Sequence, residues 1–239
     1  MNLSAALARY QGVKLTRNEI SQYQHWARSY FHNEAYVVNP YLSMTLTLEL
    51  DRDRRVYEAS FQHEPGASFQ GYLVWNLVKA LRQEWTFSTR VIEGNWYLFN
   101  NLPVHMPLAV GGDLRFKDVI LENVISMDWK TFSQCYRQAI DTPTNEIGTL
   151  DQLVWAISIF IGNLPNLNFT SFQIHRGTVK TGRPLFYFGQ RQQDDSRYSA
   201  PLSISFDHAN ADPYVLDRLL RNYHRLLNSE CQAGGGTAP

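Results

Sequence analysis

Apolar and polar side chains alternate along two stretches of the chain, and each stretch predicts a strand with one buried face. The first stretch runs from Tyr41 to Leu50. The second runs from Leu202 to His208, where side chains at every second position share a face. Its predicted apolar face ends in the histidine: Leu202, Ile204, Phe206 and His208. Its opposite face is polar: Ser203, Ser205 and Asp207.

Helical and strand-like segments are interleaved along the rest of the chain. Periodicity and capping signals predict helices over 18–33 (with Asn18 or Thr16 as N-cap), 68–83, 128–140, 150–158 and 213–227. Strands are predicted at 89–92 and 96–99, joined by the turn Glu93-Gly94-Asn95, and at 168–174 and 185–188. A polar loop, 190–199, leads into the strand that ends at His208. This interleaving favours a mixed α/β layered fold.

Length and composition predict one large domain. The chain has 239 residues, of which 44% are hydrophobic and 18% are charged, enough to build a full apolar core. We expect a single domain over residues 1–231. The glycine-rich end, residues 232–239, is predicted to be a flexible tail.

Charge and hydropathy exclude several classes of partner. Twenty-two basic residues balance 22 acidic ones without a polybasic block, so nucleic-acid binding is not expected. No apolar run approaches the roughly 18 residues of a membrane helix, and the N-terminus lacks the core of a signal peptide. The sequence therefore predicts a soluble, cytoplasmic protein that does not bind membranes. Cys135, Cys231 and the histidines lack metal-ligand spacing, so no metal site is expected.

His208 is the strongest candidate for a catalytic side chain. A histidine that ends an apolar strand face lies in partly dry surroundings, where its basicity depends strongly on its neighbours. This position favours a general base, and a buried packing histidine is the alternative. Asp212 follows four residues later, directly before Pro213. Aspartate followed by proline is a strong helix-start signal, so Asp212 is predicted to be an N-cap.

Four features, in this order along the chain, resemble the chloramphenicol acetyltransferase family. They are Trp26-Ala27-Arg28 on the first predicted long helix, the hairpin 91–99, Leu164-Pro165 followed by 168–172, and the HxxxD motif from His208 to Asp212. Residues 186–212 can be laid on the family pattern without a gap. The likeness covers nearly the whole chain in order and spacing.

The resemblance implies a fold, an assembly and a reaction. The fold would be an α/β two-layer sandwich with a mixed sheet, and the protein would be a homotrimer with active sites between subunits. His208 would deprotonate the hydroxyl of a small-molecule acceptor, which then attacks an acyl thioester, usually acetyl-CoA, without a covalent acyl-enzyme. Acyl-CoA would be a co-substrate, and no tightly bound cofactor is expected. Asp212 would pair with Arg28 and brace the histidine loop, although a shift of three residues would place His25 there.

Several positions depart from the family pattern. The glycine after the motif aspartate is Pro213. The serine that stabilises the oxyanion falls on Gly162, its companion threonine falls on Tyr187, and Thr170 is a further candidate for the pocket. Losing a side-chain oxyanion donor typically costs about 10²–10³ in turnover. The tyrosine hydroxyl is a possible replacement donor in a reshaped pocket.

The positions that the resemblance places next to CoA also depart from the family pattern. Gln190 and Arg191 stand where the family places a lysine and a tyrosine against CoA, and the other lysine falls near Ser68. Arg191 remains a candidate for binding a phosphate, because guanidinium groups bind phosphate well.

Three functions follow from these observations. The first is acyl transfer from CoA to a hydroxyl or amine of a small molecule, in antibiotic resistance or natural-product biosynthesis. The second uses an acyl carrier protein as donor, as related condensation domains do, although Asp207 replaces the first histidine of their motif. The third is a non-catalytic binding or scaffold protein, suggested by Gly162 and Pro213.

Overall fold

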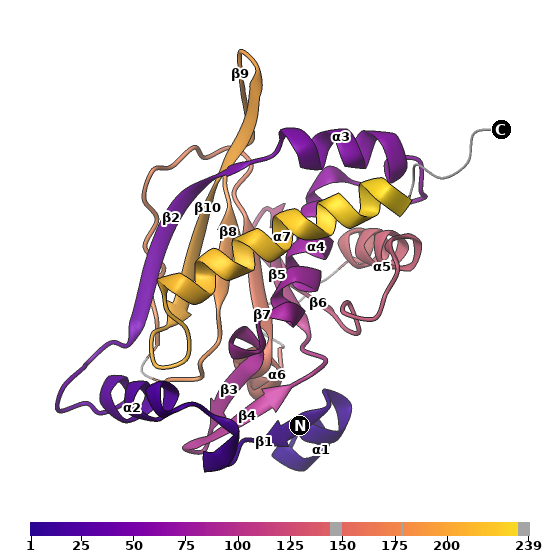
Figure 1. The fold of residues 1–239 in the computed structure, drawn as a ribbon. Coiled ribbons are helices and arrows are strands. Elements are labelled where there is room, and N and C mark those ends of the chain that lie inside the picture. Colours follow the sequence, from indigo (N-terminus) through magenta and orange to yellow (C-terminus); the bar gives the residue numbers. More distant parts are fainter. Residues whose placement is uncertain (144–149, 178, 234–239) are drawn as a thin grey trace.

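The computed structural model of the chain describes residues 1–143, 150–177 and 179–233. Within these residues a large mixed sheet forms the centre of the fold (Figure 1). Its strand order is β2-β10-β8-β7-β5-β6, and β9 pairs with one end of β10. The strands are β2 (Tyr41–Glu49), β5 (Val104–Gly111), β6 (Arg115–Leu121), β7 (Ile159–Asn163), β8 (Leu185–Phe188), β9 (Gln192–Asp194) and β10 (Arg197–Asp207). The β5–β7 and β7–β8 pairs are parallel and the others antiparallel.

Helices and a small second sheet surround this centre. The helices are α1 (Leu3–Arg9), α2 (Gln22–Phe31), α3 (Asp51–Ser60), α4 (Phe69–Gln83), α5 (Trp129–Asp141), α6 (Gln152–Ile157) and α7 (Pro213–Ala233). Short 3₁₀ turns cover Arg17–Glu19 and Trp85–Ser88. The small antiparallel sheet has the order β1-β4-β3, with β1 (Gly12–Lys14), β3 (Thr89–Ile92) and β4 (Asn95–Phe99).

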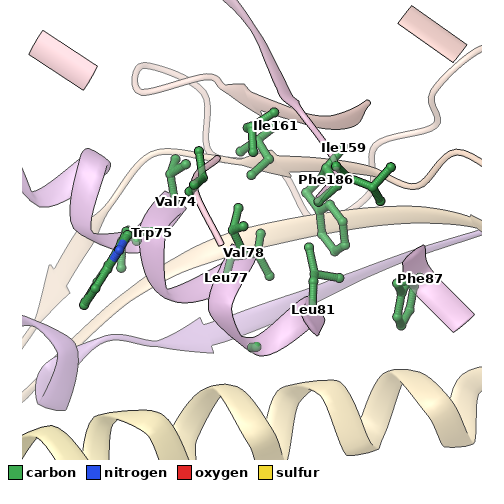
Figure 2. Close-up of a cluster of buried hydrophobic side chains, with 14 of the residues drawn as sticks. Val74, Trp75, Leu77, Val78, Leu81, Phe87, Ile159, Ile161 and Phe186 are labelled. Carbon is green, nitrogen blue, oxygen red and sulfur yellow. The ribbon is translucent and has the colours of Figure 1, made fainter. Parts of the chain in front are cut away.

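The core lies between α4 and the large sheet. Val74, Leu77, Val78 and Leu81 of α4 lie against side chains of β7 and β8 (Figure 2). The opposite side of α4 is covered by α7, so α4 is apolar on nearly all sides, as buried helices are. Ser68 starts the helix, because its Oγ accepts a hydrogen bond from the Gly71 N–H at 3.1 Å.

Most predicted elements are present, close to their expected bounds. Strand β2, the β3–β4 hairpin and β8 occupy the predicted ranges, α4 and α6 lie within theirs, and α5 ends one residue beyond its range. The predicted helix 18–33 begins later, at Gln22, because Ser21 and Gln24 form a reciprocal capping box. The predicted loop 190–199 contains β9 and the start of β10. Of the expected tail, residues 232–233 belong to α7, and residues 234–239 lie outside the described residues.

The strand predicted at residues 168–174 is wrong. These residues form neither strand nor helix and lie across the polar faces of β2 and β10. The Phe172 N–H donates to Thr45 Oγ1 at 3.3 Å, and Ser203 Oγ donates to the Phe172 carbonyl at 3.0 Å. The segment satisfies its backbone with side chains rather than with a neighbouring strand. Ser203 is therefore buried despite its place on the polar face of β10, and Ser205 is buried beside Arg176.

No helix in the described part of the chain is long and apolar enough to cross a bilayer.

Candidate active site

His208 lies in the turn that follows β10, rather than on the strand face predicted for it. The strand ends at Asp207, and the His208 N–H donates to the Pro40 carbonyl at 2.8 Å, just before β2 begins. The imidazole lies against Phe31, at the end of α2, with ring centroids 4.2 Å apart. The side chain is half-buried. The histidine is thus held by two elements distant in sequence and keeps access to solvent.

The tautomer of His208 follows from a single contact. Nδ1 lies 3.2 Å from the Ala211 carbonyl, and a carbonyl oxygen only accepts hydrogen bonds. Nδ1 therefore carries the hydrogen, and Nε2 of the neutral ring holds a free lone pair. An imidazole whose tautomer is fixed in this way is arranged to take a proton through Nε2.

Asp212 is the N-cap of α7, as predicted. Its Oδ1 accepts a hydrogen bond from the Val215 N–H at 2.9 Å. The expected partnership between Asp212 and Arg28 is wrong, because no ion pair joins them among the described residues. Arg28 Nη2 instead lies 3.4 Å from Asn210 Oδ1, and the guanidinium lies 4.0 Å from the centre of the Trp96 ring.

Arg28 still supports the histidine loop through Asn210. Asn210 Nδ2 also donates to the Thr86 carbonyl, so the residue links the loop to both α2 and the turn before β3. Burial lowers the pKa of Arg28 to about 10. The alternative residue, His25, contacts the Arg17 carbonyl and has no recorded contact with this loop in the described structure.

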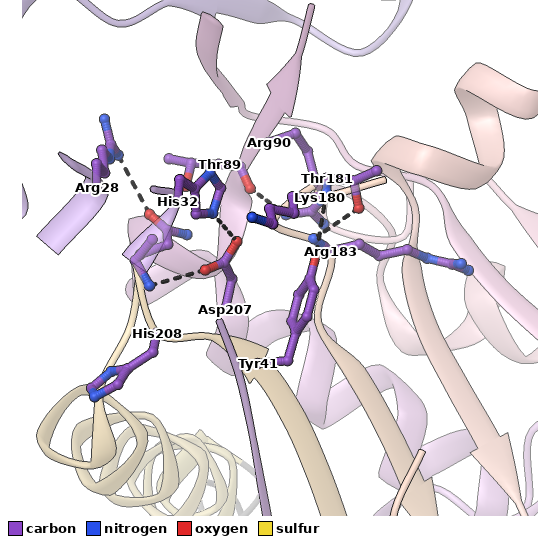
Figure 3. Close-up of polar contacts among 12 residues, drawn as sticks. Arg28, His32, Tyr41, Thr89, Arg90, Lys180, Thr181, Arg183, Asp207 and His208 are labelled. Carbon is purple, nitrogen blue, oxygen red and sulfur yellow. Dashed lines mark hydrogen bonds and ion pairs between the residues drawn. The ribbon is translucent and has the colours of Figure 1, made fainter. Parts of the chain in front are cut away.

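A second histidine, missed at the sequence level, lies close to the loop. His32 Nε2 is 2.7 Å from Asp207 Oδ2, and Asp207 Oδ1 accepts the Ala209 N–H at 2.9 Å (Figure 3). Asp207 is almost fully buried, with 1% of its surface exposed, so both oxygens need partners. Asp207 thus fixes the backbone on the C-terminal side of His208.

Gly162 and Tyr187 are brought together, and Thr170 is not. The two residues are register partners on β7 and β8, and a Cβ atom on Gly162 would lie 2.3 Å from Tyr187 Cε1. The tyrosine ring fills the space that a serine side chain would need. Burial raises the pKa of Tyr187. Thr170 is exposed on the segment that crosses the sheet.

The predicted donor-side residues lie at the N-terminus of α4. Arg191 Nη1 donates to Gln70 Oε1 at 2.7 Å, two residues after the capping residue Ser68. The neighbouring Gln190 is fixed by its backbone N–H, which donates to the Leu167 carbonyl at 2.8 Å. A guanidinium beside the N-terminus of a long helix is a favourable place for a phosphate group.

Comparison with known proteins identifies the fold. No protein-family sequence model matches the chain, and no curated protein matches it by sequence. Among solved structures, a chloramphenicol acetyltransferase superposes with a TM-score of 0.74 at 19% identity, covering 90% of this chain and 100% of that one. The dihydrolipoamide acetyltransferase of Azotobacter vinelandii gives 0.60 at 13% identity, covering 93% of each chain. A probable dihydrolipoamide acetyltransferase from Listeria monocytogenes gives 0.58 at 14%, covering 95% and 97%.

These superpositions cover nearly whole chains on both sides, so the resemblance seen in the sequence is confirmed at the level of the fold: the chain has the mixed α/β fold of chloramphenicol acetyltransferase.

Proposed function

We propose that this protein is an acyltransferase that moves an acyl group from a thioester to a hydroxyl or amine of a small molecule. The observation that carries the proposal is the fixed tautomer of His208, with Nε2 free, on a fold shared with acetyltransferases. A positioned imidazole base contributes about 10²–10⁴-fold to the rate of such a reaction.

The proposed reaction needs no covalent acyl-enzyme. His208 Nε2 takes the proton of the acceptor hydroxyl as the oxygen attacks the thioester carbonyl. The tetrahedral intermediate then breaks its carbon–sulfur bond, and the departing thiolate takes the proton back from the imidazolium. The products are an ester (or an amide, for an amine acceptor) and a free thiol. Nδ1 keeps its proton throughout, because the Ala211 carbonyl stabilises the imidazolium.

Acyl-CoA is the proposed donor, as a co-substrate and not as a bound cofactor. Its phosphates would lie near Arg191 and the N-terminus of α4, where a cation lies beside the positive end of the helix dipole. Gln190 would border this site. Tyr187 would supply the oxyanion donor that Gly162 lacks, with Thr170 at the outer edge of the pocket. We further propose that residues 1–231 act as one domain in a homotrimer.

The test is thiol release from acetyl-CoA in the presence of a panel of small alcohols and amines. We expect acceptor-dependent release by the unaltered protein and a loss of about 10²–10⁴-fold in His208→Ala. His63→Ala, which alters an exposed histidine on the loop after α3, is the matched control and should retain full activity. Equal activity in the two variants would show that His208 is not the base.

A further inference from the structure

Three arginines that the proposed reaction does not use, Arg90, Arg176 and Arg183, lie close together. Arg90 and Arg183 are almost fully buried, with 0% and 2% of their surfaces exposed. Arg176 lies near them, beside the polar face of β10. Figure 3 shows that Tyr41, Lys180 and Thr181 lie beside Arg90. Buried charges normally have a partner of opposite charge, so the surroundings of these guanidinium groups decide what they do.

Arg90 and Arg183 stabilise the C-terminal end of α6. Arg90 Nε donates to the Ile157 carbonyl at 2.8 Å, and Arg183 Nε donates to the Ser158 carbonyl at 3.3 Å. This is a structural role, because carbonyl groups at a helix end carry partial negative charge. However, the C-terminal end of a helix carries only about half an elementary negative charge, and two guanidinium groups share the end of α6.

Arg176 is held by neutral groups. Its Nη2 donates to the Ser205 carbonyl at 2.8 Å, its Nη1 donates to the Arg183 carbonyl at 2.8 Å, and its guanidinium carbon lies 4.1 Å from the centre of the Tyr41 ring. Burial lowers the pKa of Arg176 to about 10 and the pKa of Arg183 to about 9. Burial thus disfavours the charged forms of Arg176 and Arg183, and no negatively charged side chain in the described structure contacts either guanidinium group.

The nearby carboxylates are occupied elsewhere. Among the described residues, none of the three guanidinium groups bonds a carboxylate. Asp118 reaches Arg183 only through His105, whose Nδ1 accepts from Arg183 Nη2 at 2.7 Å while its Nε2 contacts Asp118. Asp207 is bonded to His32. Lys180, a fourth cation, contacts Glu34 at 3.4 Å, but the glutamate side chain is 82% exposed and such a pair is weak.

Two hollows adjoin these cations. One, of about 200 Å³, is bordered by Pro40, Tyr41, Arg176 and Lys180. The other, of about 50 Å³, is bordered by Tyr41, Trp155, Arg176 and Arg183. Both share Tyr41 and Arg176, so they form one region, which we call the arginine pocket (Tyr41, Arg176, Lys180 and Arg183).

We propose that the arginine pocket binds a phosphate group, free or carried by a small organic molecule, between Arg176 and Lys180. The anion balances the buried positive charge that no described carboxylate contacts. Tyr41 and Trp155 offer aromatic surface beside the cations, so the anionic group of a small organic molecule fits as well as a free ion. This binding site does not depend on the proposed acyl transfer, and it is tested without turnover.

Calorimetric titration with inorganic phosphate and with phenyl phosphate tests the proposal at low ionic strength. We expect saturable binding of at least one of the two probes, weakened about tenfold in Lys180→Met, because one charge-assisted hydrogen bond is lost. Tighter binding of phenyl phosphate would identify the oxyanion as part of an organic ligand, and equal or weaker binding would identify a free ion. Arg82→Met, which alters an exposed arginine of α4, is the matched control and should bind like the unaltered protein.

Glu34→Gln should change the affinity for phosphate in the opposite direction. It removes the carboxylate that contacts Lys180, so phosphate binding should tighten several-fold. Glu34 is exposed and Lys180 is partly buried, so circular dichroism of both variants checks that they fold. No saturable binding of either probe, or equal binding by Lys180→Met and Arg82→Met, overturns the proposal. Failure of anion binding would leave the proposed acyl transfer unaffected, and failure of acyl transfer would leave the proposed anion binding unaffected.

Discussion

At the residue scale, Gly162 and Tyr187 are tightly packed partners, and both belong to the proposed oxyanion side of the site. The glycine lies opposite the tyrosine in the β7–β8 pair, and the ring packs on Phe160 and Phe172 at centroid distances of 5.1 and 4.9 Å. The space beside the Gly162 backbone is therefore filled. A serine and a tyrosine cannot both occupy these positions without a shift of the backbone or the ring.

This packing predicts strong coupling between the two positions. Gly162→Ser should lower the free energy of unfolding by about 1–3 kcal/mol, because the new Cβ overlaps the Tyr187 ring. Gly162→Ser combined with Tyr187→Thr should be less destabilised than the sum of the single variants. Urea denaturation of all four proteins measures the coupling energy, and additivity within about 0.5 kcal/mol would contradict the account.

Sequence reasoning found the residues whose roles are local and missed those whose partners are distant. The N-cap Asp212 was predictable because it bonds an N–H three residues later. His32 was not, because its partner Asp207 is 175 positions away. The same holds for Arg28, whose loop partner proved to be Asn210 rather than Asp212.

At the element scale, one buried carboxylate joins two helices. Asp53 of α3 has none of its surface exposed and accepts a hydrogen bond from the Tyr223 hydroxyl of α7. Burial raises the pKa of Asp53 to about 6, although the hydrogen bond from Tyr223 opposes the shift. A carboxyl group with a raised pKa binds its proton more tightly in the folded state than in the unfolded one.

The α3–α7 contact is therefore expected to weaken as the pH rises. The contribution of Asp53 is complete below the unfolded pKa near 4 and is lost as the pH rises through about 6. Asp53→Asn should gain stability relative to the unaltered protein by up to about 3 kcal/mol between pH 4 and pH 7. Urea denaturation at several pH values measures this difference. Asp113→Asn, at an exposed turn, is the control, and parallel pH profiles for the unaltered protein and Asp53→Asn would refute the prediction.

Hydrophobic periodicity predicted helix α5, and it did not predict strand β7. Helix α5 shows the expected periodicity, whereas burial along strand β2 alternates only at its end, over Thr47, Leu48 and Glu49. Strand β7 lies between parallel neighbours and is buried on both faces, so its residues show no alternation. The segment 168–174 has the composition of a strand, but its hydrogen bonds are made with Thr45 and Ser203 side chains.

At the scale of the whole molecule, the ordered set of motifs was sufficient to identify the fold, although no sequence comparison matches. Three of the four motifs lie at the end of β10, at the β3–β4 turn and on helix α2. Assembly is a separate matter. We expect a homotrimer, in which a second subunit completes the acceptor pocket.

Sedimentation equilibrium tests the assembly. The expected mass at micromolar concentration is about three times the 27.6 kDa of one chain. A mass of one chain over the whole concentration range would exclude an active site shared between subunits.

The measurement that tests the central claim most directly is the tautomer of His208. Nitrogen-15 NMR of histidine-labelled protein at pH 8, compared with His208→Gln to assign the signals, distinguishes the two ring nitrogens. The account predicts a protonated Nδ1 and an unprotonated Nε2, because the Ala211 carbonyl accepts from Nδ1. A proton on Nε2 would contradict it, since the nitrogen proposed to take the acceptor's proton would then have no free lone pair.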